Sequence, residues 1–170
     1  ALDKVVGLAD KLPGWFGDFR EHAAHAWCIA SFLKYEFGKV YVDWEIEKVE
    51  YAYRDSRFDV VAIKPDGEKA ILEFKTIREG TEAGELIKRA AKYVRVCTDN
   101  TEFEEIQFIF QVDQNNEIPQ EGVKQLYRAL KEFQTTGNLK LPDGTIVLSI
   151  SPDEASRILK ILTWTGGYLP

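Results

Sequence analysis

The stretch from Arg57 to Thr76 constrains the fold of this chain most strongly, because it reads as two short strands joined by a tight turn. The first run, Phe58 to Ile63, is apolar and rich in β-branched residues, and Ala70 to Phe74 is a second apolar run. Between them, Pro65-Asp66-Gly67 offers a proline with a fixed φ and a glycine that tolerates a positive φ. The sequence therefore predicts an antiparallel hairpin.

Three charged side chains interrupt these apolar runs. Asp59 lies inside the first run, and Glu73 and Lys75 end the second. An acid within an apolar strand needs a partner or a cation, because burying a lone charge is costly. Side chains alternate between the faces of a strand, so Glu73 and Lys75 point the same way and Phe74 points the opposite way. Asp59 joins that face if the register of the hairpin allows it.

Two carboxylates and a lysine at one end of a hairpin are typical of a metal-dependent phosphodiesterase. Mg²⁺ and Mn²⁺ prefer oxygen ligands, and Mg²⁺ usually binds one or two carboxylates and several waters. Such an ion polarises a phosphoryl oxygen and lowers the pKa of a bound water. Lys75 would orient that water or stabilise charge in the transition state. The alternative is a structural ion pair between Asp59 and Lys75 with Glu73 solvated.

Asp59 followed fourteen residues later by Glu73-Phe74-Lys75 resembles the core motif of the PD-(D/E)XK nuclease superfamily. That superfamily includes restriction endonucleases, Holliday-junction resolvases and RecB-like nucleases. The resemblance implies that Asp59, Glu73 and the backbone carbonyl of Phe74 bind metal and that Lys75 assists the attacking water. Phe58 stands before Asp59 where the motif name has proline, at a position that varies among members.

A long helix is expected from Asp18 to about Phe37, ahead of the predicted hairpin. The resemblance implies that Glu21, in its first turn, completes the metal shell or steers a second ion. The alternative is that Glu21 only interacts favourably with the helix dipole. His25 and Glu36 are weaker candidates, although RecB-like nucleases also use a helix histidine near the site.

A second helix is expected from about Glu82 to Cys97, with a basic face. The residues expected to contact nucleic acid there and in the preceding loop are Arg78, Lys88, Arg89, Lys92 and Arg95. A solvated helix side is the alternative. RecB-like nucleases carry a Gln-x-x-x-Tyr motif on this helix, whereas this chain has Arg89-x-x-x-Tyr93 and so departs from that branch.

The remaining pattern predicts an α/β fold in one domain spanning residues 1–170. Val40 to Tyr53 alternates as a strand, bent or broken near Lys48, and Glu105 to Val112 reads as a strand parallel to the second hairpin strand. The resemblance makes residues 18–112 a restriction endonuclease-like core of helix, antiparallel three-strand meander, helix and parallel strand. Residues 113–170 are expected to add a helix–hairpin–helix extension, whose last helix includes the apolar run Ile158 to Leu162.

Composition sets further limits. The net charge of −6 and the pI near 5.1 count against a general nucleic-acid binder, although a basic region can coexist with an acidic remainder. No apolar run approaches the ~18 residues of a membrane span, so no membrane partner is expected. The two cysteines favour a reducing, cytoplasmic setting.

The functional expectation is a Mg²⁺- or Mn²⁺-dependent nuclease that binds nucleic acid, with DNA and endonuclease action preferred. The alternatives are an exonuclease, an RNA-directed nuclease, or a non-catalytic module on the same fold that binds a protein partner through its acidic surface. A homodimer is compatible with the sequence.

Overall fold

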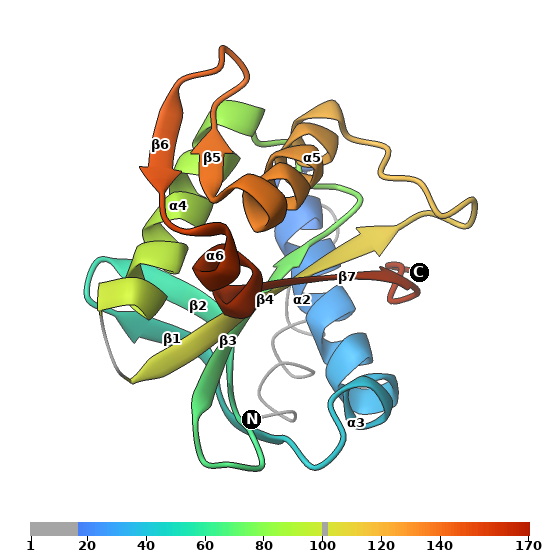
Figure 1. Ribbon diagram of the computed structural model, residues 1–170. Helices are drawn as coiled ribbons and strands as arrows, with labels where there is room; N and C mark the ends of the chain where they lie inside the picture. The colour runs from blue at the N-terminus through green and yellow to red at the C-terminus, as the bar shows by residue number, and fades with distance from the viewer. Residues whose placement is uncertain (1–16, 100–101) are drawn as a thin grey trace.

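The computed structural model describes residues 17–99 and 102–170, with side chains described from residue 22 onward (Figure 1). Its centre is a five-stranded sheet in the order β1-β2-β3-β4-β7. The first three strands form an antiparallel meander, and β4 and β7 then add in parallel. The strands are β1 Glu45–Tyr53, β2 Ser56–Ile63, β3 Lys69–Lys75, β4 Phe103–Val112 and β7 Leu159–Thr165. The expected α/β class and the meander with its parallel neighbour are confirmed.

The hairpin of β2 and β3 forms as the sequence predicts. Ile63 pairs with Lys69 next to the turn, and pairing continues to Val60 with Leu72. Gly67 takes a φ of +89°, and its amide donates to the carbonyl of Lys64 at 2.9 Å. The turn residues therefore set the register that brings the charged residues to one end of the hairpin.

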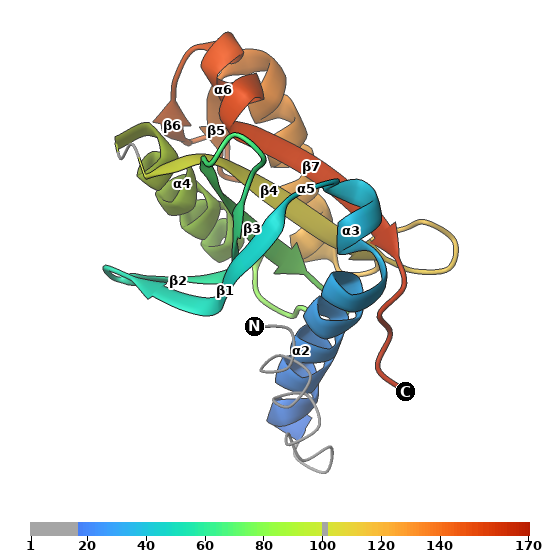
Figure 2. The same ribbon diagram turned by 90° about the horizontal axis from the view of Figure 1, so that it is seen from below.

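Helices cover both faces of the sheet (Figures 1 and 2). On one face, α2 packs against β3 through Phe32 and Phe74, whose ring centroids lie 5.3 Å apart. On the other face, a larger apolar cluster joins the sheet to three helices and a small hairpin. The elements are α2 Gly17–Tyr35 and α3 Phe37–Val40 on the first side, and α4 Ala83–Asp99, α5 Glu121–Thr136, β5 Asn138–Lys140, β6 Ile146–Ser149 and α6 Pro152–Ile158 on the second.

The first strand begins later than the alternating pattern predicts. Val40 ends the short helix α3, and Tyr41 is buried against the α2 side of the sheet while Val42 is 61% exposed. The expected strand from Val40 is therefore wrong before Glu45, because helical hydrogen bonds such as Val40 N–H to Glu36 O (3.1 Å) continue into this segment. The expected break near Lys48 is confirmed by a register shift between Ile46 and Lys48.

The last helix is shorter than expected, and part of it becomes strand β7. α6 ends at Ile158, and the chain then pairs with β4 from Leu159 opposite Ile106 to Thr165 opposite Val112. The residues of β7 point alternately to the two cores, with Leu159 on the α4 side and Leu162 on the α2 side. A short apolar run fits a buried strand as well as a helix, so periodicity could not decide between them. The extension keeps its helix–hairpin–helix order and adds a fifth strand.

Within residues 17–99 and 102–170, the helices are all too short or too polar to traverse a bilayer.

Candidate functional site

The candidate site lies where β2 and β3 stop pairing through their backbones. Their ladder ends at Val60 and Leu72. Beyond that point the amide of Asp59 donates to Glu73 Oε1 at 2.8 Å, and the amide of Phe74 donates to Asp59 Oδ2 at 2.8 Å. Two carboxylates thus take the place of backbone acceptors, which holds the acids together as the strands separate.

The remaining oxygen of Asp59 contacts helix α2. Oδ1 lies 3.0 Å from Nε2 of His25, and the two side chains are 19% and 31% exposed. Burial opposes ionisation of Asp59, but the charge of His25, its hydrogen bond and the Phe74 amide together lower the pKa of the carboxyl. Burial likewise acts to lower the pKa of His25, yet the charge of Asp59 outweighs it, so the pKa of His25 is raised. An Asp59 carboxylate facing a protonated His25 is therefore favoured.

The pKa of Glu73 is shifted in the opposite direction from that of Asp59. It is 3% exposed, and burial together with the negative charge of Asp59 raises its pKa well above the ordinary value. Lys75 and Arg89 reduce this effect without cancelling it. A buried carboxyl beside a second carboxylate is stabilised either by keeping its proton or by a nearby cation.

Lys75 is 5% exposed, and its charge acts on His25, Asp59 and Glu73. In the described part of the chain, no carboxylate lies within ion-pairing distance of its ammonium group. The alternative of a direct ion pair between Asp59 and Lys75 is therefore wrong for this structure.

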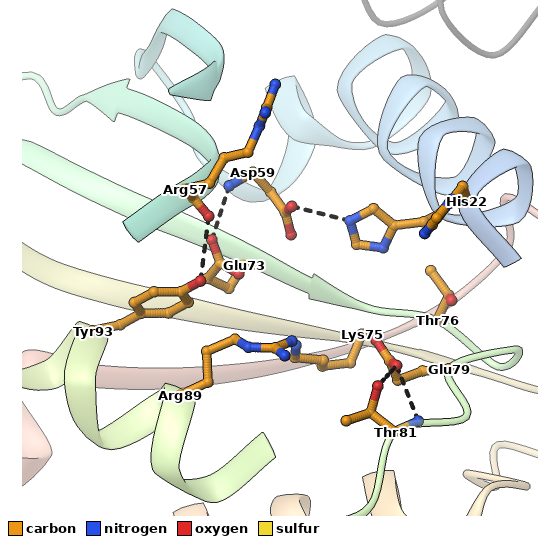
Figure 3. Close-up of a pocket in the computed structure, with 11 residues that line it drawn as sticks. His22, Arg57, Asp59, Glu73, Lys75, Thr76, Glu79, Thr81, Arg89 and Tyr93 are labelled. Carbon is orange, nitrogen blue, oxygen red and sulfur yellow. Dashed lines mark hydrogen bonds and ion pairs between the residues drawn. The ribbon is translucent and has the colours of Figure 1, made fainter. Parts of the chain in front are cut away.

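All these groups line one polar cavity of about 550 Å³ (Figure 3). The cavity is bounded by β2, β3, the loop after β3, and helices α2 and α4. Its lining residues are His22, His25, Arg57, Asp59, Glu73, Lys75, Thr76, Glu79, Thr81, Arg89 and Tyr93. The structure therefore brings the predicted residues Asp59, Glu73 and Lys75 together.

The loop after β3 is fixed at the cavity edge. Thr81 donates from its amide and its hydroxyl to Glu79 Oε1, at 3.2 and 2.5 Å. Glu79, Thr81, Arg57 and Thr76 were not predicted as site residues, because their only sequence signal is proximity to the hairpin.

Helix α4 contributes Arg89 and Tyr93, one turn apart, to the same cavity. The Tyr93 hydroxyl donates to the backbone carbonyl of Arg57 at 3.3 Å, which ties the start of β2 to the helix. Burial and the charges of Glu73 and Asp59 raise the pKa of Tyr93, so this hydroxyl stays protonated and remains a donor. The Arg-x-x-x-Tyr spacing therefore points both side chains at the candidate site.

The other basic residues do not reach the cavity lining. Lys92 contacts Asp55 Oδ2 at 3.0 Å and the Asp55 carbonyl at 3.0 Å, and Arg95 donates to the carbonyl of Val147. Hydrogen bonds with Thr145 lower the pKa of Asp143, and the charge of nearby Lys88 adds a smaller contribution. Arg78, Lys88 and Arg95 are exposed. Contact of these residues with nucleic acid stays a prediction.

Glu21 lies on α2, but its side chain is outside the described part of the structure. Its role in a metal shell therefore stays a prediction.

The candidate site contains oxygen donors of the kind that a divalent ion prefers. Among the described residues, no group of three or more His, Cys, Asp or Glu side chains is arranged to hold a metal. Mg²⁺ does not need such a group, since it binds through one or two carboxylates and retains waters. Asp59 and Glu73 supply two adjacent carboxylates, and a carboxylate oxygen that accepts one hydrogen bond keeps a second lone pair. The raised pKa of Glu73 marks a position where a cation would stabilise the ionised form. These residues fit Mg²⁺ or Mn²⁺ with water ligands.

The fold and site together define an α/β protein with a polar cavity containing two linked carboxylates, a lysine and a histidine. Comparison with known proteins finds no family model and no curated protein that matches the sequence. Among solved structures, the chain is similar to SfsA of Pyrococcus furiosus in complex with Ca²⁺, with 15% identity and a TM-score of 0.43 over 86% of this chain and 56% of that one. It is also similar to EndoMS in a complex with double-stranded DNA, with 17% identity and a TM-score of 0.37 over 58% of this chain and 38% of that one. The chain thus spans about half or less of either structure, and likenesses this weak assign no function.

Proposed function

We propose that this protein is a metal-dependent nuclease of the PD-(D/E)XK type. The observation that supports this most strongly is the convergence of Asp59, Glu73 and Lys75 in one polar cavity, with the two acids linked through backbone amides. Such a set of charged groups can support metal-assisted hydrolysis of a phosphodiester.

Each residue has a distinct role in this proposal. Asp59 and Glu73 hold the ion, with Glu21 and the Phe74 carbonyl as additional ligands. When bound, Mg²⁺ or Mn²⁺ polarises the phosphoryl oxygen and acidifies a water. Lys75 orients the attacking water and stabilises negative charge in the transition state. His25 keeps Asp59 ionised and oriented through its hydrogen bond.

The substrate in this proposal is DNA, cut within the strand. Arg89 faces the same cavity and carries a charge that reaches Glu73, so it is placed to meet a phosphate oxygen. Cleavage from a strand end and cleavage of RNA are distinguished by the products formed from circular, linear and RNA substrates.

The test compares the parent protein with Asp59→Asn, Glu73→Gln and Lys75→Ala on plasmid and single-stranded DNA, with Mg²⁺ or Mn²⁺. Each variant should lose roughly 10²-fold or more in rate, as when a transition-state donor is removed from an active site. Lys160→Ala is the control, because Lys160 is exposed on β7, outside the cavity lining, and its ammonium donates to the carbonyl of Ser156. Activity that survives in all three site variants contradicts the proposal.

A second candidate function is a non-catalytic module that binds a protein partner. It is favoured by the net charge of −6 and by the engagement of both Asp59 oxygens with donors from the protein itself. A purified parent protein that cuts no nucleic acid with either metal would support this alternative.

A further inference from the structure

Three exposed arginines lie between the cavity and the β1–β2 turn, among the carboxylates Glu50 and Asp55, and we call them the basic track: Arg54, Arg57 and Arg89. Arg57 and Arg89 line the cavity, and Arg54 lies in the two-residue turn that precedes β2. All three are exposed. The track contrasts with the overall net charge of −6.

The turn that carries the track is fixed relative to the cavity. The Tyr93 hydroxyl holds the carbonyl of Arg57 at 3.3 Å, and Lys92 holds the carbonyl of Asp55 at 3.0 Å (Figure 3 shows the first contact). Both donors come from α4, the helix that also carries Arg89. The three guanidinium groups therefore project from elements that are attached to each other.

The guanidinium groups of the track are available to an external anion. Arg57 has a side chain that is 69% exposed, and its nearest carboxylate, on Glu50, lies at 3.8 Å, beyond hydrogen-bonding distance. Arg54 lies over the ring of Tyr53 at 5.3 Å. In the described part of the chain, neither Arg54 nor Arg89 has a carboxylate within ion-pairing distance.

The position of the track beside the acids suggests what it binds. Asp59 is two residues from Arg57 along β2, about 6.6 Å at the usual strand rise. A phosphate next to the one at the carboxylates is therefore within reach of the long Arg57 side chain. Guanidinium groups suit phosphate oxygens because they donate two parallel hydrogen bonds.

We propose that the basic track binds the phosphates that flank the scissile phosphate on one side, so that the bound strand leaves the cavity across the β1–β2 turn. This inference rests on the proposed function and specifies its substrate as a polynucleotide with several phosphates beyond the cut. Because the contacts are to the backbone, the track adds affinity that does not depend on base sequence.

The experiment measures binding of a fluorescent single-stranded oligonucleotide in EDTA, so that the strand is not cut, over a range of salt concentrations. The variant is Arg54→Gln with Arg57→Gln, which removes two charges and keeps most of each side chain. We expect Kd to rise roughly three- to tenfold, as for the loss of two exposed charge pairs. The slope of log K against log salt should fall by about 0.7 for each lost contact.

The matched control is Arg128→Gln with Arg157→Gln, which removes the same charge from exposed positions on α5 and α6. It should bind like the parent, and thermal unfolding of both double variants confirms that they are folded. If the track variant binds like the parent with the same salt slope, the inference is overturned. It is also overturned if the control loses as much affinity, because the effect would then be one of general charge.

Failure of the inference can be separated from failure of the proposed function. Hydrolysis of bis(4-nitrophenyl) phosphate by the parent protein with Mn²⁺ tests the chemistry alone, since this diester has one phosphate and no flanking phosphate for the track to bind. A parent protein that does not hydrolyse this diester would count against the proposed nuclease activity. The oligonucleotide-binding result tests the basic track whether or not the diester is hydrolysed.

Discussion

At the scale of single residues, Asp59 is the centre of the candidate site. It contacts α2 through His25, contacts β3 through the Phe74 amide, and donates its own amide to Glu73. The charges of His25 and Lys75 favour the ionised form of Asp59 against the effect of burial, and the charge of Asp59 in turn adds to the effect of burial in raising the pKa of Glu73. Predictions at this scale concern the cost of keeping two acids together.

Glu73→Gln should stabilise the metal-free protein near neutral pH while it removes activity. Glutamine keeps an oxygen for the Asp59 amide but eliminates the buried negative charge that opposes Asp59. The free energy of unfolding should rise by roughly 0.5–2 kcal/mol, the usual range for a stabilising substitution. Urea unfolding in EDTA measures this free energy. A variant that is less stable than the parent would contradict the inferred unfavourable interaction between Glu73 and Asp59.

The stability of the metal-free protein should fall as the pH rises. The pKa values of Glu73 and His25 are raised in the folded state above their ordinary 4.5 and 6.5, so their contributions are complete below those values and are lost as the pH rises through the folded pKa values. Asp59, with a lowered pKa, loses its contribution only below about 3.8.

Between pH 5 and pH 8 the loss should be roughly 1–2 kcal/mol, since each proton contributes at most about 1.4 kcal/mol per pH unit. Urea unfolding in EDTA at several pH values measures it. In a double variant with Glu73→Gln and His25→Asn, the free energy of unfolding should depend less on pH. If that variant shows the same pH dependence as the parent, other groups cause the loss of stability.

At the scale of elements, the helix and the hairpin of the extension are joined to each other through a closely packed junction. Gly137 follows α5 with a φ of +79°, and its carbonyl accepts from the Ile150 amide at 2.9 Å. A Cβ at this position would lie 1.9 Å from the carbonyl oxygen of Ile150. This glycine therefore permits the close approach between α5 and the end of the β5–β6 hairpin.

Gly137→Ala should reduce the free energy of unfolding by roughly 1–3 kcal/mol, because alanine is strained at positive φ and meets the Ile150 carbonyl. Gly84→Ala is the matched control, since it lies in α4 with no atom within 4 Å of its added Cβ. Thermal or urea unfolding compares the two. Equal effects from both substitutions would show that the junction carries no strain.

The sequence predicted the elements whose signals are local. The hairpin could be predicted because its turn residues and apolar runs are adjacent, and Asp59, Glu73 and Lys75 could be chosen because charges in apolar strands stand out. The histidine partner His25 was ranked only as a weaker candidate, because it lies 34 residues from Asp59 and only the packing of α2 brings it close. Strand β7 was missed because its short apolar run has no distinguishing period.

At the scale of the whole molecule, two features concern the site: the distribution of charge, and the support that the C-terminal strand gives to the sheet. The chain is acidic overall, yet two exposed arginines, Arg57 and Arg89, line its polar cavity. The last described strand, β7, pairs along most of β4, so the C-terminal segment completes the sheet that supports the site. The extension is therefore part of the structural support of the site.

A chain that ends at Ile158 should lose cooperative unfolding. It would leave the β4 edge without its parallel partner and expose apolar residues such as Ile109 and Phe108, which are at most 1% exposed. Circular dichroism during heating and size-exclusion chromatography should show broad melting and aggregation. A sharp transition close to that of the full chain would mean that β7 contributes little to stability.

Where β2 separates from β3, two backbone amides donate to carboxylates and not to the partner strand. The amides of Asp59 and Phe74 are protected by side-chain acceptors, and the strength of those acceptors depends on their ionisation and on any bound cation. Hydrogen–deuterium exchange at these two backbone positions would consequently report the state of the carboxylates directly. The exchange rates of these two amides would therefore follow ionisation or cation binding at the site without an added label or a substrate.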